Sequence, residues 1–323
     1  MEYIREQTAK EILDMDLSKT DALSLSGIHG YTIEQLQAIN VLLEKADCHV
    51  CLDCDLGETK HDDSSLFYNI DIIQYLRNVK QLIVSNFPFR KEIGSIDFVQ
   101  YTPLLQSLTI LGLIKKSISL EKLSNLQQLD TLHFKDYLDI SKKQCAAINN
   151  LSRLKDLEVK QVDAMNLTSN TNMKRLSVCS KLTNGECVPD KFPNLEYLYL
   201  KRQTNCKDFS FISRLENLKE LYLYWIYGLE TLPDLSKLHN LERLELYGCP
   251  NLCYGIEQVS SLSKLKRFCA SEQTRLTVED FENTLSKIQG LKSVHITFRN
   301  NNKANIAMNE LMNKYNWTVS PYR

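Results

Sequence analysis

The chain lacks the short motifs by which many enzymes hold phosphates, metals or activated nucleophiles. Only 10 of its 323 residues are glycine, and neither of the glycine-rich phosphate loops, G-x-x-x-x-G-K-[ST] and G-x-G-x-x-G, occurs. The zinc-protease motif H-E-x-x-H and the hydrolase motif G-x-S-x-G are also missing. We therefore predict that the protein is not an enzyme, has no catalytic residues, and needs neither a cofactor nor a metal ion.

The sequence also lacks a charge surplus and a long apolar run. Its 39 basic and 40 acidic residues leave a net charge of -1, which gives no general attraction to nucleic acid or anionic lipid. No stretch approaches the ~18 to 20 apolar residues of a membrane span, and the first residues show no signal-peptide run. We expect a cytoplasmic protein, bacterial in source, with neither membrane nor nucleic acid as a partner. Export as an effector by a non-classical route is left open.

One phrase is repeated along the chain: an apolar residue, two others, an apolar residue, two others, then Leu-x-Leu. Clear copies are FPNLEYLYL (192–200), LENLKELYL (215–223) and LHNLERLEL (238–246). The first residue of each apolar-x-apolar pair serves as a marker, and the markers from Leu23 to Trp317 make 12 intervals over 294 residues, about 24.5 each. Such alternation predicts one strand per repeat with one buried face, and stacked repeats share a continuous core.

This array resembles the leucine-rich repeat family, whose unit is L-x-x-L-x-L-x-x-N/C-x-L in 20–29 residues. The best copy is LPDLSKLHNLERLELYGCPNL (232–252), with Cys249 in the N/C position. The resemblance covers residues 20 to 320 and implies an α/β fold of about 12–13 repeats. That fold is a curved solenoid with a parallel β-sheet on the concave face and helices and irregular segments on the convex face. Most repeats lack the family's asparagine at the N/C position.

The array also predicts the domain organisation. Residues 1–20 form an N-terminal cap segment, and residues 21–323 form a single solenoid that ends in a capping helix and strand. We expect this body to be a monomer. Helical periodicity, with apolar residues on one face, predicts helices over 32–46, 65–76, 145–151, 277–288 and 303–315.

The stretch CHVCLDCD (48–55) looks at first like a metal site. Alternation along a strand instead places Cys48 and Cys54 in the core and Cys51 on the other face. Residues three apart on a strand are about 10 Å apart, whereas two thiolates on one zinc lie within roughly 4 Å. His49, Cys51 and Asp53 share a face and remain the alternative ligand set. The aspartates would raise the pKa of Cys51, which disfavours a reactive thiol.

The outward positions of the strands lie one before, one after and three after each marker. Five tyrosines occupy such positions on three adjacent strands: Tyr197, Tyr199, Tyr222, Tyr224 and Tyr247. Trp225 and Tyr227 follow in a loop. Tyrosine and tryptophan anchor many protein interfaces, because they bury a large area with few rotatable bonds. The alternative is that the tyrosines only pack on one another as cross-strand pairs.

Charged residues complete the predicted binding surface. The full set of predicted partner-binding residues is Glu158, Lys160, Tyr197, Tyr199, Lys201, Glu220, Tyr222, Tyr224, Trp225, Tyr227, Arg243, Glu245 and Tyr247. The nearest exposed histidine–carboxylate pair, His133 with Glu158, is interpreted as a solvated histidine.

The predicted function is therefore non-catalytic recognition of a protein partner through the concave face of the solenoid. Two alternatives remain open at this stage. The protein could be a stoichiometric inhibitor or immunity protein that neutralises a toxin or enzyme. It could also bind nucleic acid or a small ligand through stacked tyrosines, together with Lys135, Lys160, Lys201 and Arg243.

Overall fold

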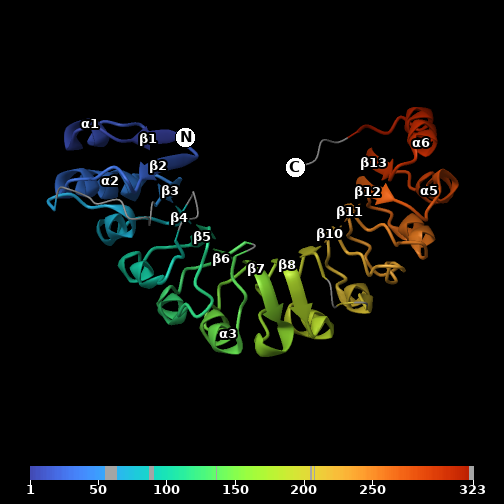
Figure 1. Cartoon of the computed structure of the whole chain (residues 1–323), viewed down its shortest axis with the longest axis horizontal. Helices are drawn as coiled ribbons and strands as arrows, with labels where there is room; N and C mark the ends of the chain where they lie inside the picture. The colour runs from blue at the N-terminus through green and yellow to red at the C-terminus, as the bar shows by residue number, and fades with distance from the viewer. Residues whose placement is uncertain (55–63, 87–90, 136, 204–205, 207, 320–323) are drawn as a thin grey trace. The chain divides into compact units, whose positions relative to one another are not determined.

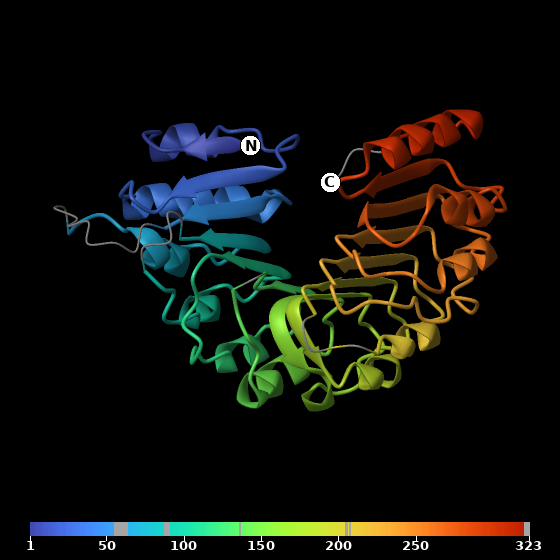
Figure 2. The ribbon, with the colours of Figure 1, turned by 45° about the vertical axis from the view of Figure 1, so that its right-hand side comes forward.

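The computed structural model describes residues 1–54, 64–86, 91–135, 137–203, 206 and 208–319. The chain divides into two compact units, Met1–Lys160 and Gln161–Arg323, here called unit 1 and unit 2. Each unit has two layers (Figure 1 and Figure 2): strands that pair in sequence order form one layer, and helices and irregular segments form the other.

Unit 1 contains six complete repeats and the start of a seventh. Its elements are β1 (Glu2–Ile4), α1 (Ala9–Leu13), β2 (Ala22–Ser26), α2 (Ile33–Lys45), β3 (His49–Asp53), η1 (Asn69–Tyr75), β4 (Gln81–Ser85), η2 (Asp97–Tyr101), β5 (Ser107–Leu111), η3 (Glu121–Asn125), β6 (Thr131–His133), α3 (Lys142–Asn149) and β7 (Asp156–Asp163), where η denotes a 3-10 helix. Strand β7 begins in unit 1 and runs across the boundary. All of these strands are parallel, and each marker pairs with the next, as Leu82 does with Leu108.

Unit 2 continues the same pattern. Its elements are η4 (Ala164–Asn166), β8 (Arg175–Thr183), η5 (Gly185–Cys187), α4 (Val188–Lys191), β9 (Tyr197–Lys201), η6 (Ser210–Arg214), β10 (Glu220–Tyr224), β11 (Arg243–Tyr247), η7 (Ile256–Ser261), β12 (Arg267–Gln273), α5 (Val278–Leu285), β13 (Ser293–Phe298) and α6 (Asn302–Lys314). Leu198, Leu221 and Leu244 are directly paired across β9, β10 and β11. All three are fully buried.

The repeat register predicted from the sequence is confirmed. Every marker from Leu23 to Val294 lies in a strand and is at most 1% exposed. One strand per repeat gives 13 strands among the described residues, in agreement with the expected 12–13 repeats. The α/β solenoid architecture follows directly, because no repeat can bury its leucines without a neighbour.

At the two ends of the array, the observed strands differ from those that the repeat spacing predicts. Residues 1–20 supply β1, which pairs in parallel with β2, and α1, which packs on α2. At the other end, the described part of the strand expected around Trp317 forms a single bridge between Ser293 and Thr318. Asn316, with a φ of 55°, interrupts the extended backbone there. Ser320, the last residue of that expected strand, lies outside the described residues.

Four of the five predicted helices are α-helices. The longest, α2 and α6, lie near the two ends of the chain, as expected. Helix α3 begins earlier than predicted because Ser141 and Gln144 form a capping box. The helix predicted over 65–76 is instead the 3-10 helix η1. A 3-10 helix rises about 2 Å per residue and so spans the width of a repeat with fewer residues than an α-helix.

The turns after the strands are held by polar groups other than the missing asparagines. Gln203 occupies the N/C position and is buried. Its Nε2 donates to the carbonyl oxygens of Val178 (3.0 Å) and Lys201 (2.9 Å), and its Oε1 accepts from the amide of Leu182 (2.7 Å). Two repeats further along the chain, Cys249 occupies the N/C position, and its buried thiol donates to the carbonyl oxygen of Leu223. These side chains satisfy backbone groups that would otherwise lack a hydrogen-bond partner among the side chains at this position.

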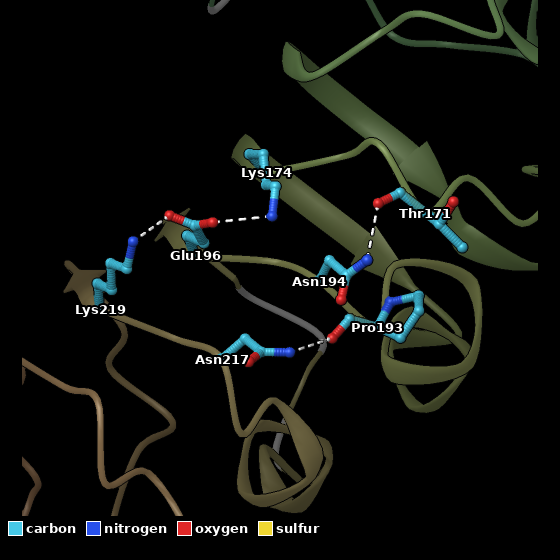
Figure 3. Close-up of polar contacts among 7 residues, drawn as sticks. All are labelled: Thr171, Lys174, Pro193, Asn194, Glu196, Asn217 and Lys219. Atoms are coloured by element: carbon cyan, nitrogen blue, oxygen red, sulfur yellow. Dashed lines mark hydrogen bonds and ion pairs between the residues drawn. The ribbon is translucent and has the colours of Figure 1, made fainter.

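An asparagine ladder does exist in unit 2, but before the strands and not after them (Figure 3). The Nδ2 atom of Asn194 donates to the carbonyl oxygen of Thr171 (2.9 Å), and that of Asn217 donates to Pro193 (3.0 Å). Asn240 makes the equivalent contact one repeat later. The sequence signal for this ladder is the Asn-Leu dipeptide that occurs in each of the three clearest repeats.

Candidate functional site

An aromatic cluster lies on the strand face of unit 2. We define it as the six side chains of Tyr197, Tyr199, Tyr222, Tyr224, Trp225 and Tyr247. The five tyrosines belong to β9, β10 and β11, where Tyr199 pairs with Tyr222 and Tyr224 pairs with Tyr247 in the parallel register, and Trp225 directly follows β10. Because side chains alternate along a strand, these rings face away from the leucine core.

The rings form a continuous diagonal band across the three strands. Ring centroids are 5.1 Å apart for Tyr197–Tyr222, 5.2 Å for Tyr199–Tyr224 and 5.4 Å for Tyr224–Tyr247. The interplanar angles of these pairs, between 40° and 63°, are tilted or edge-to-face. Such geometry is favoured by the ring quadrupoles and contributes about 0.5–1.5 kcal/mol per pair beyond area burial. The cross-strand packing that the sequence suggested as an alternative is therefore present.

The burial of two outward positions corrects the sequence prediction. Tyr222 and Glu245, which the alternation placed in solvent, are only 8% and 4% exposed. Neighbouring rings surround Tyr222, since both Tyr197 and Tyr199 lie within about 6 Å of it. Alternation sets the face of the sheet to which a side chain points, but it does not tell whether large neighbours cover that side chain. Tyr227, in contrast, is exposed, as its loop position suggested.

Two carboxylates and two arginines hold the central tyrosines in place. The Tyr222 hydroxyl donates to the Glu220 carboxylate and accepts from Arg243 Nη1 at 2.8 Å. Arg243 also lies 3.5 Å from Glu220. Burial, followed by the hydrogen bond to the Glu220 carboxylate, raises the pKa of the Tyr222 phenol well above its ordinary value. This phenol therefore stays protonated and acts as a donor at neutral pH.

The same arrangement recurs one repeat further along the chain. The Tyr224 hydroxyl donates to the Glu245 carboxylate, and Arg267 Nε lies 3.2 Å from the other oxygen of that carboxylate. Burial and this hydrogen bond raise the pKa of Tyr224 as well. The predicted set did not include Arg267, although its position one before the marker Phe268 placed it on the same face.

Further cations lie over the rings. The guanidinium of Arg175 is 3.7 Å from the centroid of the Tyr197 ring. The Lys201 ammonium and the Arg202 guanidinium lie 5.5 Å and 5.2 Å from the Trp225 ring. These distances are within the range of cation–π attraction. The predicted set of site residues includes Lys201 but neither Arg175 nor Arg202. Contacts between a cation and a ring on a neighbouring repeat depend on the length of the side chain as well as on the strand register.

Trp225 adopts an unusual backbone conformation at the edge of the cluster. Its φ is 52°, in the left-handed region that a bulky residue rarely adopts. The next repeat has Gly248 at the equivalent position, with a φ of 64°. A Cβ atom on Gly248 would lie 2.4 Å from Trp225 Cδ1. The glycine therefore leaves space for the indole, which packs edge-on against Tyr247 at 5.5 Å.

The remaining predicted site residues, Glu158 and Lys160, belong to unit 1. Lys160 Nζ lies 3.3 Å from Asp139, and Glu158 lies 3.3 Å from Lys135 Nζ. His133 Nε2 is 3.0 Å from an oxygen of Asp156, and its ring also approaches Glu158. The interpretation of His133 as a solvated side chain is therefore wrong. The β6–β7 register places it directly opposite a carboxylate.

The structure agrees with the core assignment of the cysteines. Cys48 and Cys54 are buried, Cys51 is half-buried, and all ten cysteines are free thiols. Burial, followed by the charge of Asp53, raises the pKa of the Cys51 thiol, in the predicted direction. Within the described ranges no group of His, Cys, Asp and Glu is arranged to hold a metal ion. Asp55, the last residue of this stretch, and His61, further along the chain, lie outside the described residues.

No family model and no curated protein matches the chain. Solved structures that match include internalin C2 from Listeria monocytogenes (17% identity, 73% of this chain and 87% of that one, TM-score 0.41). The plant peptide hormone receptor RGFR1 in complex with RGF2 (16%, 86% and 46%, 0.45) and TLR13 in complex with ssRNA13 (15%, 91% and 52%, 0.37) also match. The chain thus spans about half of the RGFR1 chain and half of the TLR13 chain.

The repeat period and the single strand per repeat decide the architecture. The fold is a leucine-rich repeat solenoid. In the part of this solenoid that the structure describes, each helix is too short or too polar to cross a membrane. The solenoid brings eleven of the predicted site residues into unit 2, and most of them lie in or beside the aromatic cluster.

Proposed function

We propose that this solenoid recognises a protein partner through the aromatic cluster and has no catalytic activity of its own. One observation carries the proposal: six aromatic side chains on adjacent repeats are held in fixed positions on a face that the core does not use. Tyrosine and tryptophan are enriched among the residues that dominate protein–protein binding energies.

Rigidity supports a binding role. The hydroxyls of Tyr222 and Tyr224 are fixed by carboxylates, so these two rings act as an inner support. Tyr199, Trp225 and Tyr247 remain partly exposed around them. Ordering a free side chain on binding costs about 0.5–1.5 kcal/mol, and a cluster that is already ordered avoids much of this cost.

The ring geometry favours protein over nucleic acid as the partner. Single-stranded nucleic acid binds by stacking its bases on open aromatic faces. Here the Tyr197 face carries Arg175, and the Trp225 ring has Lys201 and Arg202 nearby. The other rings pack against one another at tilted angles. Aromatic rings combined with cations and hydroxyl groups in this way suit the mixed apolar and polar contacts of a protein interface.

A pull-down with matched variants tests the proposal. The Tyr199→Ala/Tyr247→Ala double variant should reduce capture of specific partners at least about tenfold, because each ring is expected to contribute on the order of 1–2 kcal/mol. The Gln81→Ala/Thr109→Ala double variant alters two outward positions of β4 and β5 in unit 1. It should capture the same partners as the wild type.

Circular dichroism and thermal unfolding establish that both double variants are folded. If the tyrosine variant captures the same proteins as the wild type in equal amount, the aromatic cluster is not the binding surface. Equal losses for both variants would point instead to a surface spread over both units.

A further inference from the structure

We propose that the partner segment that docks on the aromatic cluster is acidic. This inference rests on the proposed function and adds the chemistry of the partner. It is based on a basic rim around the cluster, which we define as Arg175, Lys201, Arg202, Arg243 and Arg267.

The rim flanks the aromatic band on both sides. Lys201 and Arg202 lie at the end of β9, and Lys201 is paired in register with Tyr224. Arg243 and Arg267 lie at the start of β11 and β12 and are paired with each other. Arg175, which is exposed, starts β8 and covers Tyr197. A segment lying along the band would therefore have cations on either side.

The acidic groups inside the cluster do not balance this rim. Within the described strands β8–β12 the carboxylates are Glu220, Glu245 and Glu272, against the five cations of the rim. Glu220 and Glu245 each already accept a tyrosine hydroxyl and lie beside an arginine. The surface thus carries a local positive surplus, although the whole chain has a net charge of -1. Such a local field attracts a partner of opposite charge.

The row of charged residues that precedes the strands does not remove the positive surplus. In the row that precedes the strands, Glu196 lies between Lys174 (2.8 Å) and Lys219 (2.6 Å), as Figure 3 shows. The same row continues with Glu242 paired to Lys266 at 2.7 Å. These charges alternate and largely neutralise one another, so they form a border with little net charge beside the rim.

The cations are suited to binding carboxylates. The side chains of Arg243 and Arg267 are only 27% and 15% exposed, so water screens their charges less than on an open surface. A guanidinium presents several donors in a plane and can bind a carboxylate with two hydrogen bonds. His295, on the neighbouring strand β13, adds no charge at neutral pH. Its pKa is lowered by burial and then by the charge of Arg267.

The chain provides its own reporter for a test. It has two tryptophans, and Trp317 is nearly buried and stacked on Tyr315. A Trp317→Phe background leaves Trp225, inside the cluster, as the sole source of indole fluorescence. The probes are a short capped peptide that alternates Glu with Leu, its Gln-for-Glu and Lys-for-Glu analogues, and an oligothymidylate.

The Glu peptide should change Trp225 emission in a saturable way, and its affinity should fall as the salt concentration rises. Arg202→Glu should weaken this binding about fivefold or more, because a surface attraction becomes a repulsion. Arg202→Gln, a milder change, should weaken it less. The matched control Lys122→Glu reverses an exposed charge on η3 in unit 1 and should leave the affinity unchanged.

Several results would contradict the proposal that the partner segment is acidic. If the Gln or Lys peptide binds as tightly as the Glu peptide, the cluster binds peptides but the rim does not select acidic ones, and the proposed function stands. Tighter binding of oligothymidylate would replace the protein segment by a nucleic acid. If no peptide changes the Trp225 emission, the acidic inference is wrong, and the Tyr199→Ala/Tyr247→Ala pull-down decides separately on the proposed function.

Discussion

The strand faces of unit 1 and unit 2 share one kind of core but present different side chains to solvent. Leu108 in β5 and Leu221 in β10 are both fully buried at the same repeat position. The outward neighbours of Leu108 are Ser107 and Thr109, whereas those of Leu221 are Glu220 and Tyr222. Packing constrains the inward positions in both units equally. The outward positions are free to vary, so packing of the leucine core does not require the tyrosines of unit 2.

The largest expected effect tests whether the two cores are equivalent. Leu108→Ala and Leu221→Ala should each lower the free energy of unfolding by about 2–5 kcal/mol, since each leaves a cavity at a fully buried site. Urea unfolding measures both losses, and we expect them to agree within about 1 kcal/mol. A much smaller loss in one unit would show that the units differ in their cores as well as in their outward faces.

The next effect concerns the space that Gly248 leaves for Trp225. Gly248→Ala should destabilise the protein by about 1–3 kcal/mol, because φ is positive there and the added Cβ would collide with the indole. The Trp225 emission in the Trp317→Phe background should shift as the ring moves. The control in unit 1 is Gly94→Ala, where an added Cβ meets nothing within 4 Å. A similar thermal shift for both variants would contradict the close packing described here.

A smaller effect separates binding from stability at Trp225. Trp225→Gly should be about 1 kcal/mol more stable than Trp225→Ala, because only glycine adopts the left-handed conformation without steric cost. Both variants should lose partner binding alike. Arg202, with a φ of 52°, is the same turn position one repeat earlier, so Arg202→Gly and Arg202→Ala should show the same difference in thermal unfolding. If alanine is as stable as glycine at both sites, the turn is not strained.

The smallest effect is the pH dependence of the charged row beside the strands. Hydrogen bonds from Lys174 and then Lys219 lower the pKa of Glu196 below its ordinary value of 4.5. A carboxylate with a lowered folded-state pKa contributes stability above the unfolded pKa and loses it as pH falls through the folded value. Between neutral pH and about pH 3, Glu196→Gln should therefore lose about 0.5 kcal/mol less than the wild type.

The matched variant in unit 1 is Asp130→Asn, which removes a single pair with Lys155 at 3.1 Å. Acid titrations followed by circular dichroism measure the Glu196→Gln difference. At neutral pH, urea unfolding should show a smaller loss of stability for Asp130→Asn than for Glu196→Gln, because only one lysine is involved. An equal or larger effect for Asp130→Asn would show that the alternating row of unit 2 adds nothing to an isolated pair.

Most of the fold could be predicted from the sequence because its signal is local and repeated. The alternation around Leu198, Leu221 and Leu244 identifies strands, and the constant spacing identifies their neighbours. Strand β1 was not predicted, because Glu2–Ile4 has a single buried residue and no earlier repeat from which its position could be counted. The 3-10 helix η1 was also not predicted, because helical periodicity does not distinguish the two helix types over so few residues.

The candidate site was predicted in part. Alternation and register identified the five tyrosines, and their position next to Trp225 followed from the loop. The supporting role of Arg267, the cations over the rings at Arg175 and Arg202, and the burial of Tyr222 were not predicted. Each of these depends on side chains that meet across repeats more than 20 residues apart, and on how far those side chains reach.

By itself, the sequence determined the period, the buried face of each strand and the register of the array, because burying a leucine in every repeat leaves one way to stack them. Only the tertiary structure decided which outward side chains touch. The hydroxyls of Tyr222 and Tyr224 donate to the carboxylates of Glu220 and Glu245. The Trp225 indole occupies the space left by Gly248. Those contacts depend on rotamers and neighbouring volumes, which no pattern of apolar and polar residues encodes.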